Sequence, residues 1–128
     1  MKKRVLLVDD DQVFNFVSTK MLEKIGSNEI HVASNGEQAL QLINDYYSGI
    51  QIMPDVILLD LNMPVMDGFG FIEAFKHLNI PGKENIKIVI VSSSHNPNDR
   101  KHAKELGIEY YLEKPIKQKD LAAIMGEN

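Results

Sequence analysis

The fold of this chain is decided by one stretch, Pro54-Asp55-Val56-Ile57-Leu58-Leu59-Asp60-Leu61-Asn62-Met63-Pro64-Val65-Met66-Asp67-Gly68. Four apolar residues lead directly into Asp60, and the turn pair Asp67-Gly68 closes the stretch. An unbroken apolar run bounded by turn residues predicts a strand that is buried on both faces. Asp60 would then lie at the carboxyl end of the strand, the edge at which open parallel sheets bind ligands. We therefore interpret Asp60 as the reacting residue; the alternative is a carboxylate that ends the strand in solvent.

The composition limits the class of protein. The chain has 128 residues, of which 44% are hydrophobic and 25% charged, and we expect a single domain over residues 1–128 with no effector domain. Its net charge is −4 and no basic patch stands out, so direct binding to nucleic acid is not expected. The absence of cysteine excludes disulfides and thiol chemistry. Because the sequence has no signal peptide and no run of membrane-spanning length, we expect a cytoplasmic protein without membrane contact.

Short apolar runs alternate with segments of helical periodicity along the chain. Strands are expected at Arg4–Val8, Glu29–Ala33, the opening stretch, 87–91 and 108–113. Helices are expected at 11–25, after a cap at Ser34, after a cap at Asp67, at 96–106 and at 117–125. Five alternations of strand and helix predict an α/β fold, a doubly wound parallel sheet in the order 2-1-3-4-5 with helices on both faces.

Two helices carry more detailed local patterns. The first has apolar residues at helical spacing that we expect to face the core: Phe14, Val17, Met21 and Ile25. The second is preceded by Ser34 with Glu37 three residues later, which matches a capping box.

In this strand order, strands 1, 3, 4 and 5 are neighbours. Their carboxyl ends carry Asp9 and Asp10, Asp60, Ser92 and Lys114. Carboxylates brought together in this way repel, so either their pKa values rise or a cation lies among them. An all-oxygen site with few protein ligands suits Mg²⁺, which also binds phosphate oxygens. A nucleophilic carboxylate, a divalent cation, a lysine and a hydroxyl are the groups needed to move a phosphoryl group onto Asp60.

These motifs resemble those of response-regulator receiver domains, in particular the stand-alone type of the chemotaxis regulator. The resemblance covers essentially the whole chain and rests on Asp9-Asp10, the stretch from Asp60 to Gly68, Ser92 and Lys114-Pro115. It implies a flavodoxin-like three-layer fold and a phosphorylation-activated switch of a two-component system. It also implies a phosphoryl donor, either a sensor histidine kinase or a phosphotransfer protein, and a downstream protein target. Dimerisation on phosphorylation is left open.

The resemblance assigns roles around the acceptor. Asp60 would be the phosphoacceptor, Asp10 a direct Mg²⁺ ligand and Asp9 a ligand through water. Asn62 would contribute its backbone carbonyl to the metal. Asn62 and Ser94 also lie where this family tunes the hydrolysis rate of its acyl phosphate. Asp11 extends the acidic pair, and we interpret it as a charge at a helix start.

The resemblance also implies how the signal leaves the site. Ser92 would move toward the phosphoryl group, and Lys114 would pair with it across a cis Lys114-Pro115 peptide. Tyr111 would be the aromatic switch that turns inward when Ser92 moves, although residue parity alone does not decide between Tyr111 and Tyr110. The fourth helix, fifth strand and fifth helix would form the output surface.

Three other classes of protein compete with this interpretation. An aspartate-nucleophile phosphatase usually carries another acid two residues after the nucleophile, where this chain has Asn62. A flavin or nucleotide carrier needs a glycine-rich phosphate loop after the first strand, where this chain has three aspartates. A binding module that is never phosphorylated would not need the complete acceptor set. We expect catalysis only of the chain's own phosphorylation and dephosphorylation, and a longer loop before Pro54 than is usual in the family.

Overall fold

The chain forms a five-stranded parallel sheet in the order β2-β1-β3-β4-β5. The computed structural model describes residues 3–26, 29–47, 53–63 and 66–126. The strands are β1 Arg4–Val8, β2 Glu29–Ala33, β3 Val56–Asp60, β4 Lys87–Ser92 and β5 Tyr110–Glu113. The helices are α1 Gln12–Ile25, α2 Gly36–Tyr47, α3 Gly68–His77, α4 Pro97–Glu105 and α5 Gln118–Gly126, with a short 3₁₀ helix η1 at Lys83–Asn85. The predicted flavodoxin-like α/β fold and its strand order are confirmed.

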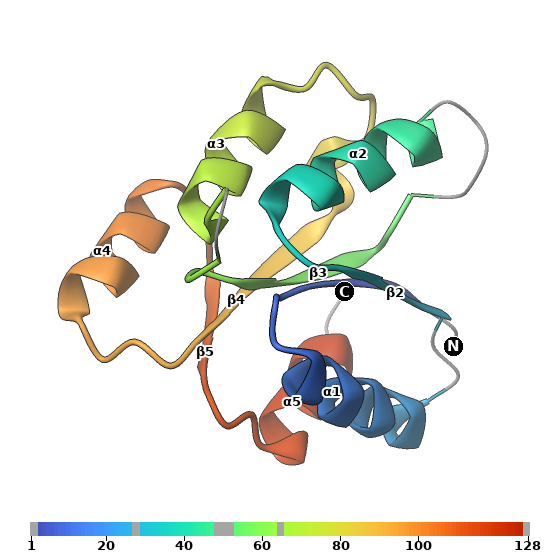
Figure 1. Ribbon diagram of the computed structural model, residues 1–128, viewed down its shortest axis with the longest axis vertical. Helices are drawn as coiled ribbons and strands as arrows, with labels where there is room; N and C mark the ends of the chain where they lie inside the picture. Colours follow the sequence, from blue (N-terminus) through green and yellow to red (C-terminus); the bar gives the residue numbers. More distant parts are fainter. Residues whose placement is uncertain (1–2, 27–28, 48–52, 64–65, 127–128) are drawn as a thin grey trace.

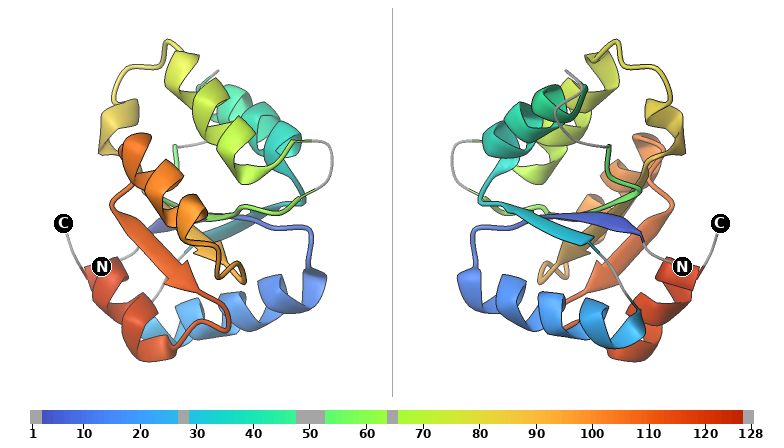
Figure 2. Two further views of the ribbon diagram at one scale, coloured as in Figure 1. Left: turned by 90° about the vertical axis from the view of Figure 1, so that its left-hand side faces the viewer. Right: turned by 90° about the vertical axis from the view of Figure 1, so that its right-hand side faces the viewer.

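Helices cover both faces of the sheet and make three layers (Figures 1 and 2). Helices α2, α3 and α4 lie on one face, and α1 and α5 lie on the other. Successive strand residues point to opposite faces, so Leu6 and Leu59 pack on the α2–α4 side while Leu7 and Leu58 pack on the α1–α5 side. Because both faces are covered, β1 and β3 read as continuous apolar runs rather than alternating ones.

The sheet register aligns the carboxyl ends of four strands. Val8 pairs with Leu59, Leu59 pairs with Ile90, and Ile90 pairs with Tyr111. Each predicted site residue lies one to three positions after one of these paired residues: Asp9, Asp10, Asp60, Ser92 and Lys114. The backbone of the sheet therefore brings the predicted site residues to one edge.

Helix α1 packs on the core with three of its four predicted residues, but its most buried residues are others. Its buried residues are Asn15, Ser18 and Leu22, whereas Val17 is 46% exposed. The side-chain Nδ2 of Asn15 donates a hydrogen bond of 2.9 Å to the backbone carbonyl oxygen of Asp9. This polar contact with the end of β1 sets the rotation of the helix, which apolar spacing alone did not reveal. The other predicted core residues of the helix are partly buried: Phe14, Met21 and Ile25.

The predicted capping box of α2 is wrong by one residue. The helix begins at Gly36, and the side-chain oxygen of Asn35 accepts a hydrogen bond of 2.8 Å from the N–H of Gln38. The side-chain oxygen of Gln38 in turn accepts the N–H of Ser34. Asn35 therefore caps the helix and Gln38 reaches back to the backbone of Ser34, in place of the predicted pair of Ser34 with Glu37. Both sets of residue types can satisfy the free N–H groups of a helix start.

Three other helix starts are capped by side chains at the predicted places. Asp11 accepts the N–H of Phe14 at the start of α1, which confirms that it serves a helix start. Asp67 accepts the N–H of Gly70 in α3, and Asn96 caps α4. Residues 48–52 of the loop predicted to be long, and Pro64 and Val65 of the opening stretch, lie outside the described residues.

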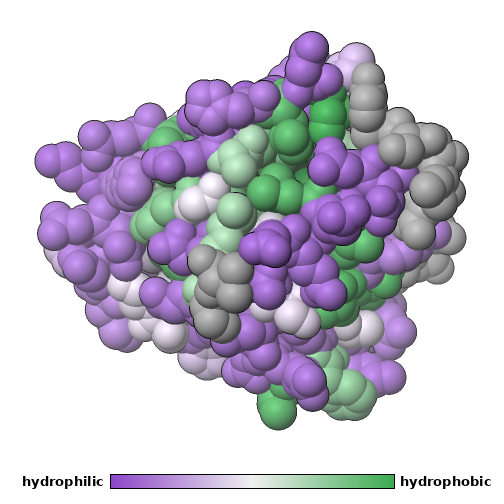
Figure 3. Space-filling model, turned by 45° about the horizontal axis from the view of Figure 1, so that its top comes forward, coloured by the Kyte–Doolittle hydropathy of each residue, from purple (hydrophilic) through white to green (hydrophobic). Residues whose placement is uncertain are grey.

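The outward sides of the helices are largely polar. On the side of the molecule shown in Figure 3, hydrophilic residues predominate and hydrophobic ones gather in patches between them. Within the part of the chain that the structure describes, no helix combines the length and apolar character needed to cross a bilayer.

The start of α3 lies directly against the tip of β3 at Gly68. A Cβ atom on Gly68 would lie 2.5 Å from the carbonyl oxygen of Asp60 and 2.9 Å from the Cα of Leu61. Because both neighbours are backbone atoms, we expect Gly68→Ala to lower the free energy of unfolding by about 2 kcal/mol or more, measured by urea denaturation. The control is Gly126→Ala, where a Cβ would have no neighbour within 4 Å. Equal denaturation midpoints for the two variants would contradict this account of the strand tip.

Candidate functional site

Three carboxylates meet at the carboxyl ends of β1 and β3. Asp9, Asp10 and Asp60 each present an oxygen, and these oxygens all lie within 4.8 Å of one another. Asp9 is 2% exposed and Asp60 is 6% exposed, whereas Asp10 is open to solvent. The cluster thus has two buried acids and one acid at its rim, which is the convergence that the strand order predicted.

The ammonium group of Lys114 lies between the two buried acids. Its Nζ is 2.7 Å from Oδ2 of Asp9 and 3.5 Å from Oδ1 of Asp60. The backbone N–H of Lys114 donates to the carbonyl oxygen of Ser92 at 2.9 Å. The Lys114-Pro115 peptide is cis, as predicted. Lys114 is therefore fixed at its backbone by β4 and at its charged end by the acids.

Ser92 is fully buried at the end of β4. Its hydroxyl oxygen accepts the backbone N–H of Ser94 at 3.0 Å. The hydroxyl of Ser94 donates to Oδ2 of Asp99 in α4 and accepts the backbone N–H of Asn96. The structure thus connects Ser92 to the start of α4 through Ser94, whose own hydroxyl is bonded toward the helix.

The environment of Asp60 disfavours its charged form. Burial, and next the charge of Asp9, raise the pKa of Asp60 from 3.8 to about 6. The charge of Lys114 and a backbone hydrogen bond from Asn62 act in the opposite direction without cancelling the rise. The three acids outnumber the one ammonium here, and each acid offers a carboxylate oxygen as a metal ligand. The residues therefore fit a hard divalent cation such as Mg²⁺, which receiver domains generally bind at an acidic pocket of this kind.

Phe14 belongs to the site in a way that the sequence pattern did not indicate. The Nζ of Lys114 lies over the ring of Phe14, 4.2 Å from its centroid. Helical spacing only assigned Phe14 to the buried side of α1. Its partner, Lys114, is distant in the sequence, so the spacing of residues within α1 could not indicate this contact.

The two adjacent tyrosines of β5 lie on opposite faces of the sheet. Tyr111 packs with the α2–α4 cluster, and the guanidinium carbon of Arg100 in α4 lies 4.3 Å from its ring centroid. Tyr110 packs with the α1–α5 cluster instead. The hydroxyl of Tyr111 is buried and has no hydrogen-bond partner among the described residues. Tyr111 is thus the tyrosine that contacts α4, a distinction that residue parity left open.

Comparison with known proteins identifies the family. The family model of the response regulator receiver domain matches residues 5–125. The chain belongs to this family. Receiver domains act as phosphorylation switches in two-component signalling, and that is the general function of this domain.

Relatives and solved structures agree with this membership. A probable transcriptional regulator, ycf27, of Guillardia theta is 33% identical over 122 residues, which are 95% of this chain and 43% of the relative. A two-component response regulator from Cytophaga hutchinsonii has a TM-score of 0.87 at 30% identity, over 98% of this chain and 96% of that one. The Mn²⁺-bound form of response regulator Rcp1 has a TM-score of 0.78 at 29% identity, over 95% and 88%. The chain spans less than half the length of curated relatives such as the ycf27 regulator.

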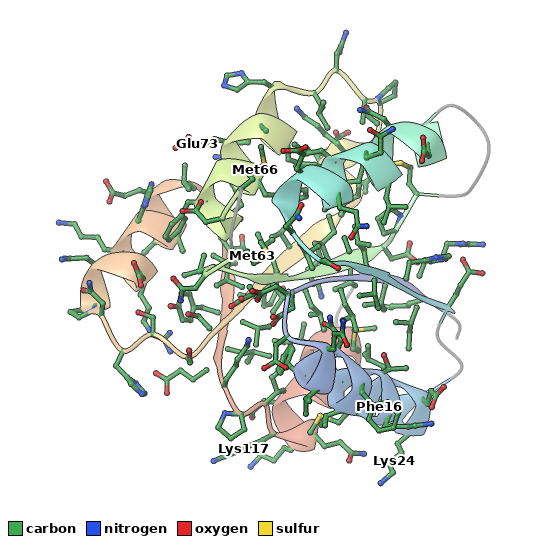
Figure 4. The ribbon with its side chains drawn as sticks, viewed as in Figure 1. Phe16, Lys24, Met63, Met66, Glu73 and Lys117 are labelled. Carbon is green, nitrogen blue, oxygen red and sulfur yellow. The ribbon has the colours of Figure 1, made fainter. Side chains whose placement is uncertain are left out.

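The raised pKa of Asp60 makes the stability of the metal-free domain depend on pH. Protonated Asp60 favours the folded state, so its contribution is fully present below about pH 4 and is lost as the pH rises through about 6. We expect Asp60→Asn to exceed the wild type in unfolding free energy by about 2 kcal/mol at pH 7.5 in EDTA, and the difference to shrink toward pH 4. Urea denaturation across this range measures the difference. Glu73→Gln, on the exposed surface of α3 (Figure 4), is the control and should track the wild type. A pH-independent difference for Asp60→Asn would contradict the assignment.

Proposed function

We propose that Asp60 accepts a phosphoryl group from the phosphohistidine of a sensor histidine kinase or phosphotransfer protein. Mg²⁺ would be held by Asp9, Asp10, Asp60 and the backbone carbonyl of Asn62. The observation that carries the proposal is the ammonium of Lys114 between two buried carboxylates. The existence of a Mn²⁺-bound form of the similar Rcp1 supports the binding of a divalent cation by this domain. The domain would act in the cytoplasm, where ATP-dependent kinases supply the phosphoryl group.

The transfer uses groups that lie at the strand ends. A carboxylate oxygen of Asp60 forms a bond to phosphorus while the bond from phosphorus to the donor nitrogen breaks, and the nitrogen keeps the electron pair. The metal, when bound, supplies positive charge for the phosphoryl oxygens. Lys114, at 3.5 Å from Asp60, pairs with another of these oxygens. The hydroxyl of Ser92 accepts a hydrogen bond from Ser94 and keeps its own proton to donate to a third oxygen.

Attack by water on the acyl phosphate would break the bond from phosphorus to Asp60 and release inorganic phosphate. The proposal assigns the rate of this hydrolysis to the residues that border the acceptor. Asn62 is exposed two positions after Asp60. Ser94 lies two positions after Ser92 and is hydrogen-bonded to Asp99 of α4. An exposed amide at Asn62 cannot act as a general acid. We therefore prefer a self-regulating switch to a phosphatase that turns over small esters.

The signal would pass from Ser92 to the surface made by α4, β5 and α5. The hydrogen bonds from Ser94 to Ser92 and from Ser94 to Asp99 support this route, because Ser94 contacts both Ser92 and the first turn of α4. Tyr111 supports it as well, since its buried hydroxyl is unpaired among the described residues and its ring packs under Arg100 of α4. Helix α4 buries one residue, Ala103, so few apolar contacts resist its movement.

The phosphoryl donor would dock on α1 beside the acid cluster. Val13 and Val17 are 72% and 46% exposed on this helix. They line a groove of about 450 Å³ that also includes Lys114 and Pro115. Exposed apolar side chains that border a buried acceptor suit the apolar helical surface on which a phosphohistidine is presented.

Labelling with a small phosphoryl donor tests the acceptor. With acetyl phosphate and Mg²⁺, we expect one phosphoryl group that hydroxylamine removes, detected by intact-mass spectrometry, in the wild type and none in Asp60→Asn. Asp55→Asn is the matched control, since Asp55 lies at the amino end of the same stretch and is exposed. Labelling of Asp60→Asn at the wild-type level would refute the proposed acceptor.

A change on α1 tests the docking surface separately. We expect Val17→Glu to slow transfer from a phosphorylated histidine phosphotransfer protein by about tenfold or more, because it places a charge in an apolar contact. Transfer from acetyl phosphate should be unchanged, since that donor needs no docking surface. Gln41→Glu adds the same charge on α2, on the opposite face of the sheet, and should leave both rates unchanged. Equal losses with both donors would instead indicate damage to the site itself.

A further inference from the structure

The ring of Phe14 lies against the charged end of Lys114. The distance of 4.2 Å from Nζ to the ring centroid is well inside the ~6 Å over which the negative face of an aromatic ring attracts a cation. The Lys114 side chain is only 18% exposed, so water screens this attraction less than it would at the surface. The ammonium therefore has three neighbours: Asp9, Asp60 and the Phe14 ring.

The backbone of Phe14 is tied to the acid cluster itself. The backbone N–H of Asp11 donates to Oδ1 of Asp9 at 2.9 Å, and the backbone N–H of Phe14 donates to Oδ1 of Asp11 at 3.1 Å. Lys114 donates to Oδ2 of Asp9. With the ring contact, these interactions form a closed circuit through Asp9, Asp11, Phe14 and Lys114. The backbone that carries the ring is therefore bonded, through Asp11, to the carboxylate that Lys114 binds.

We propose that Phe14 is a positioning residue for phosphoryl transfer, whose ring holds the ammonium of Lys114 beside Asp60. The inference rests on the proposed function, because it presumes that Asp60 is phosphorylated. A lysine carries a compact, strongly hydrated charge on a flexible stem, and here it lies closer to Asp9 than to Asp60. The ring takes the place of water on one side of the ammonium. It thereby limits the ammonium to positions between the two acids, which raises the fraction of molecules ready for transfer.

Ring-fluorinated phenylalanines test this role, because fluorine weakens the negative face of the ring with little change in shape. We expect the rate of phosphorylation by acetyl phosphate with Mg²⁺ to fall stepwise from the unmodified ring at Phe14 to a trifluorinated one. The total decrease should be about fivefold, equivalent to about 1 kcal/mol. Phosphorylation of Phe14→Leu should be at least as slow as that of the trifluorinated protein. Phe14→Tyr, which keeps the aromatic face, should retain most of the wild-type rate. A small donor is used so that docking on α1 does not enter the rate.

Phe16 provides a matched control on the same helix. It is 64% exposed, and Lys20 places its Nζ 5.4 Å from the Phe16 ring centroid, away from the acid cluster (Figure 4). The same fluorine series at Phe16 should leave the phosphorylation rate unchanged. A parallel decrease at both positions would assign the effect to helix stability and overturn the proposal.

Proton NMR of the metal-free domain gives a readout that does not depend on activity. The ring current of Phe14 should move the ε-methylene protons of Lys114 upfield of ordinary lysine values, and trifluorination should reduce this displacement as the ammonium leaves the ring. Ordinary values in the wild type, or equal rates across the Phe14 series in a domain that is phosphorylated, would overturn the role of Phe14 alone. Absence of phosphorylation in the wild type, with the NMR displacement present, would overturn the proposed function and the role of Phe14 in it while leaving the ring contact intact.

Discussion

The structure depends on an imbalance of charge at one edge of the sheet. Two buried carboxylates, Asp9 and Asp60, share one ammonium from Lys114, with a third acid at the rim. A parallel sheet forces this crowding, because hydrogen-bonded strands in register must end at the same edge. The remaining negative charge favours a divalent cation and, after it, a phosphoryl group whose oxygens need several positive neighbours. Binding at this edge thus relieves repulsion that the folded chain contains from the start.

The same imbalance costs the folded domain stability. Burial of Asp60 is the largest cause of its raised pKa, which means that folding disfavours the charged form of the residue that we propose as phosphoryl acceptor. The surrounding core compensates: β3 is buried along its full length, and large side chains such as Phe71 and Leu121 are fully enclosed. A rigid apolar sheet therefore holds an unfavourable polar edge in place.

Most of the fold could be predicted from the sequence because its signals are local and repeated. The run ending at Asp60 indicated a doubly covered strand, and five alternations of strand and helix left few topologies. What failed depended on contacts across the chain. Asn15 turns α1 through a bond to the Asp9 carbonyl, which a count of apolar residues ignores. At α2, Asn35 displaced Ser34 as the cap because several polar residues in succession can serve that position.

The meeting of the acids and Lys114 at one edge was predictable, whereas the contacts of their side chains were not. Strand order alone brought the acids and Lys114 to one edge. The ring of Phe14 over Lys114 and the dominance of burial in the pKa of Asp60 are consequences of side-chain packing, which the sequence does not encode in any short pattern. Tyr111 and Tyr110 could be distinguished only once each was assigned to a face of the sheet.

The close approach of Gly68 to the tip of β3 makes the two sides of the site mechanically unequal. Helix α3 starts against the backbone of Asp60 and Leu61. It also buries Phe71, Ile72 and Phe75, so it is packed firmly on the sheet. Helix α4 buries Ala103 alone and reaches the site through hydroxyl groups. If Asp60 is phosphorylated as proposed, a rearrangement at the acceptor would therefore meet less packing on the α4 side of the site than on the α3 side.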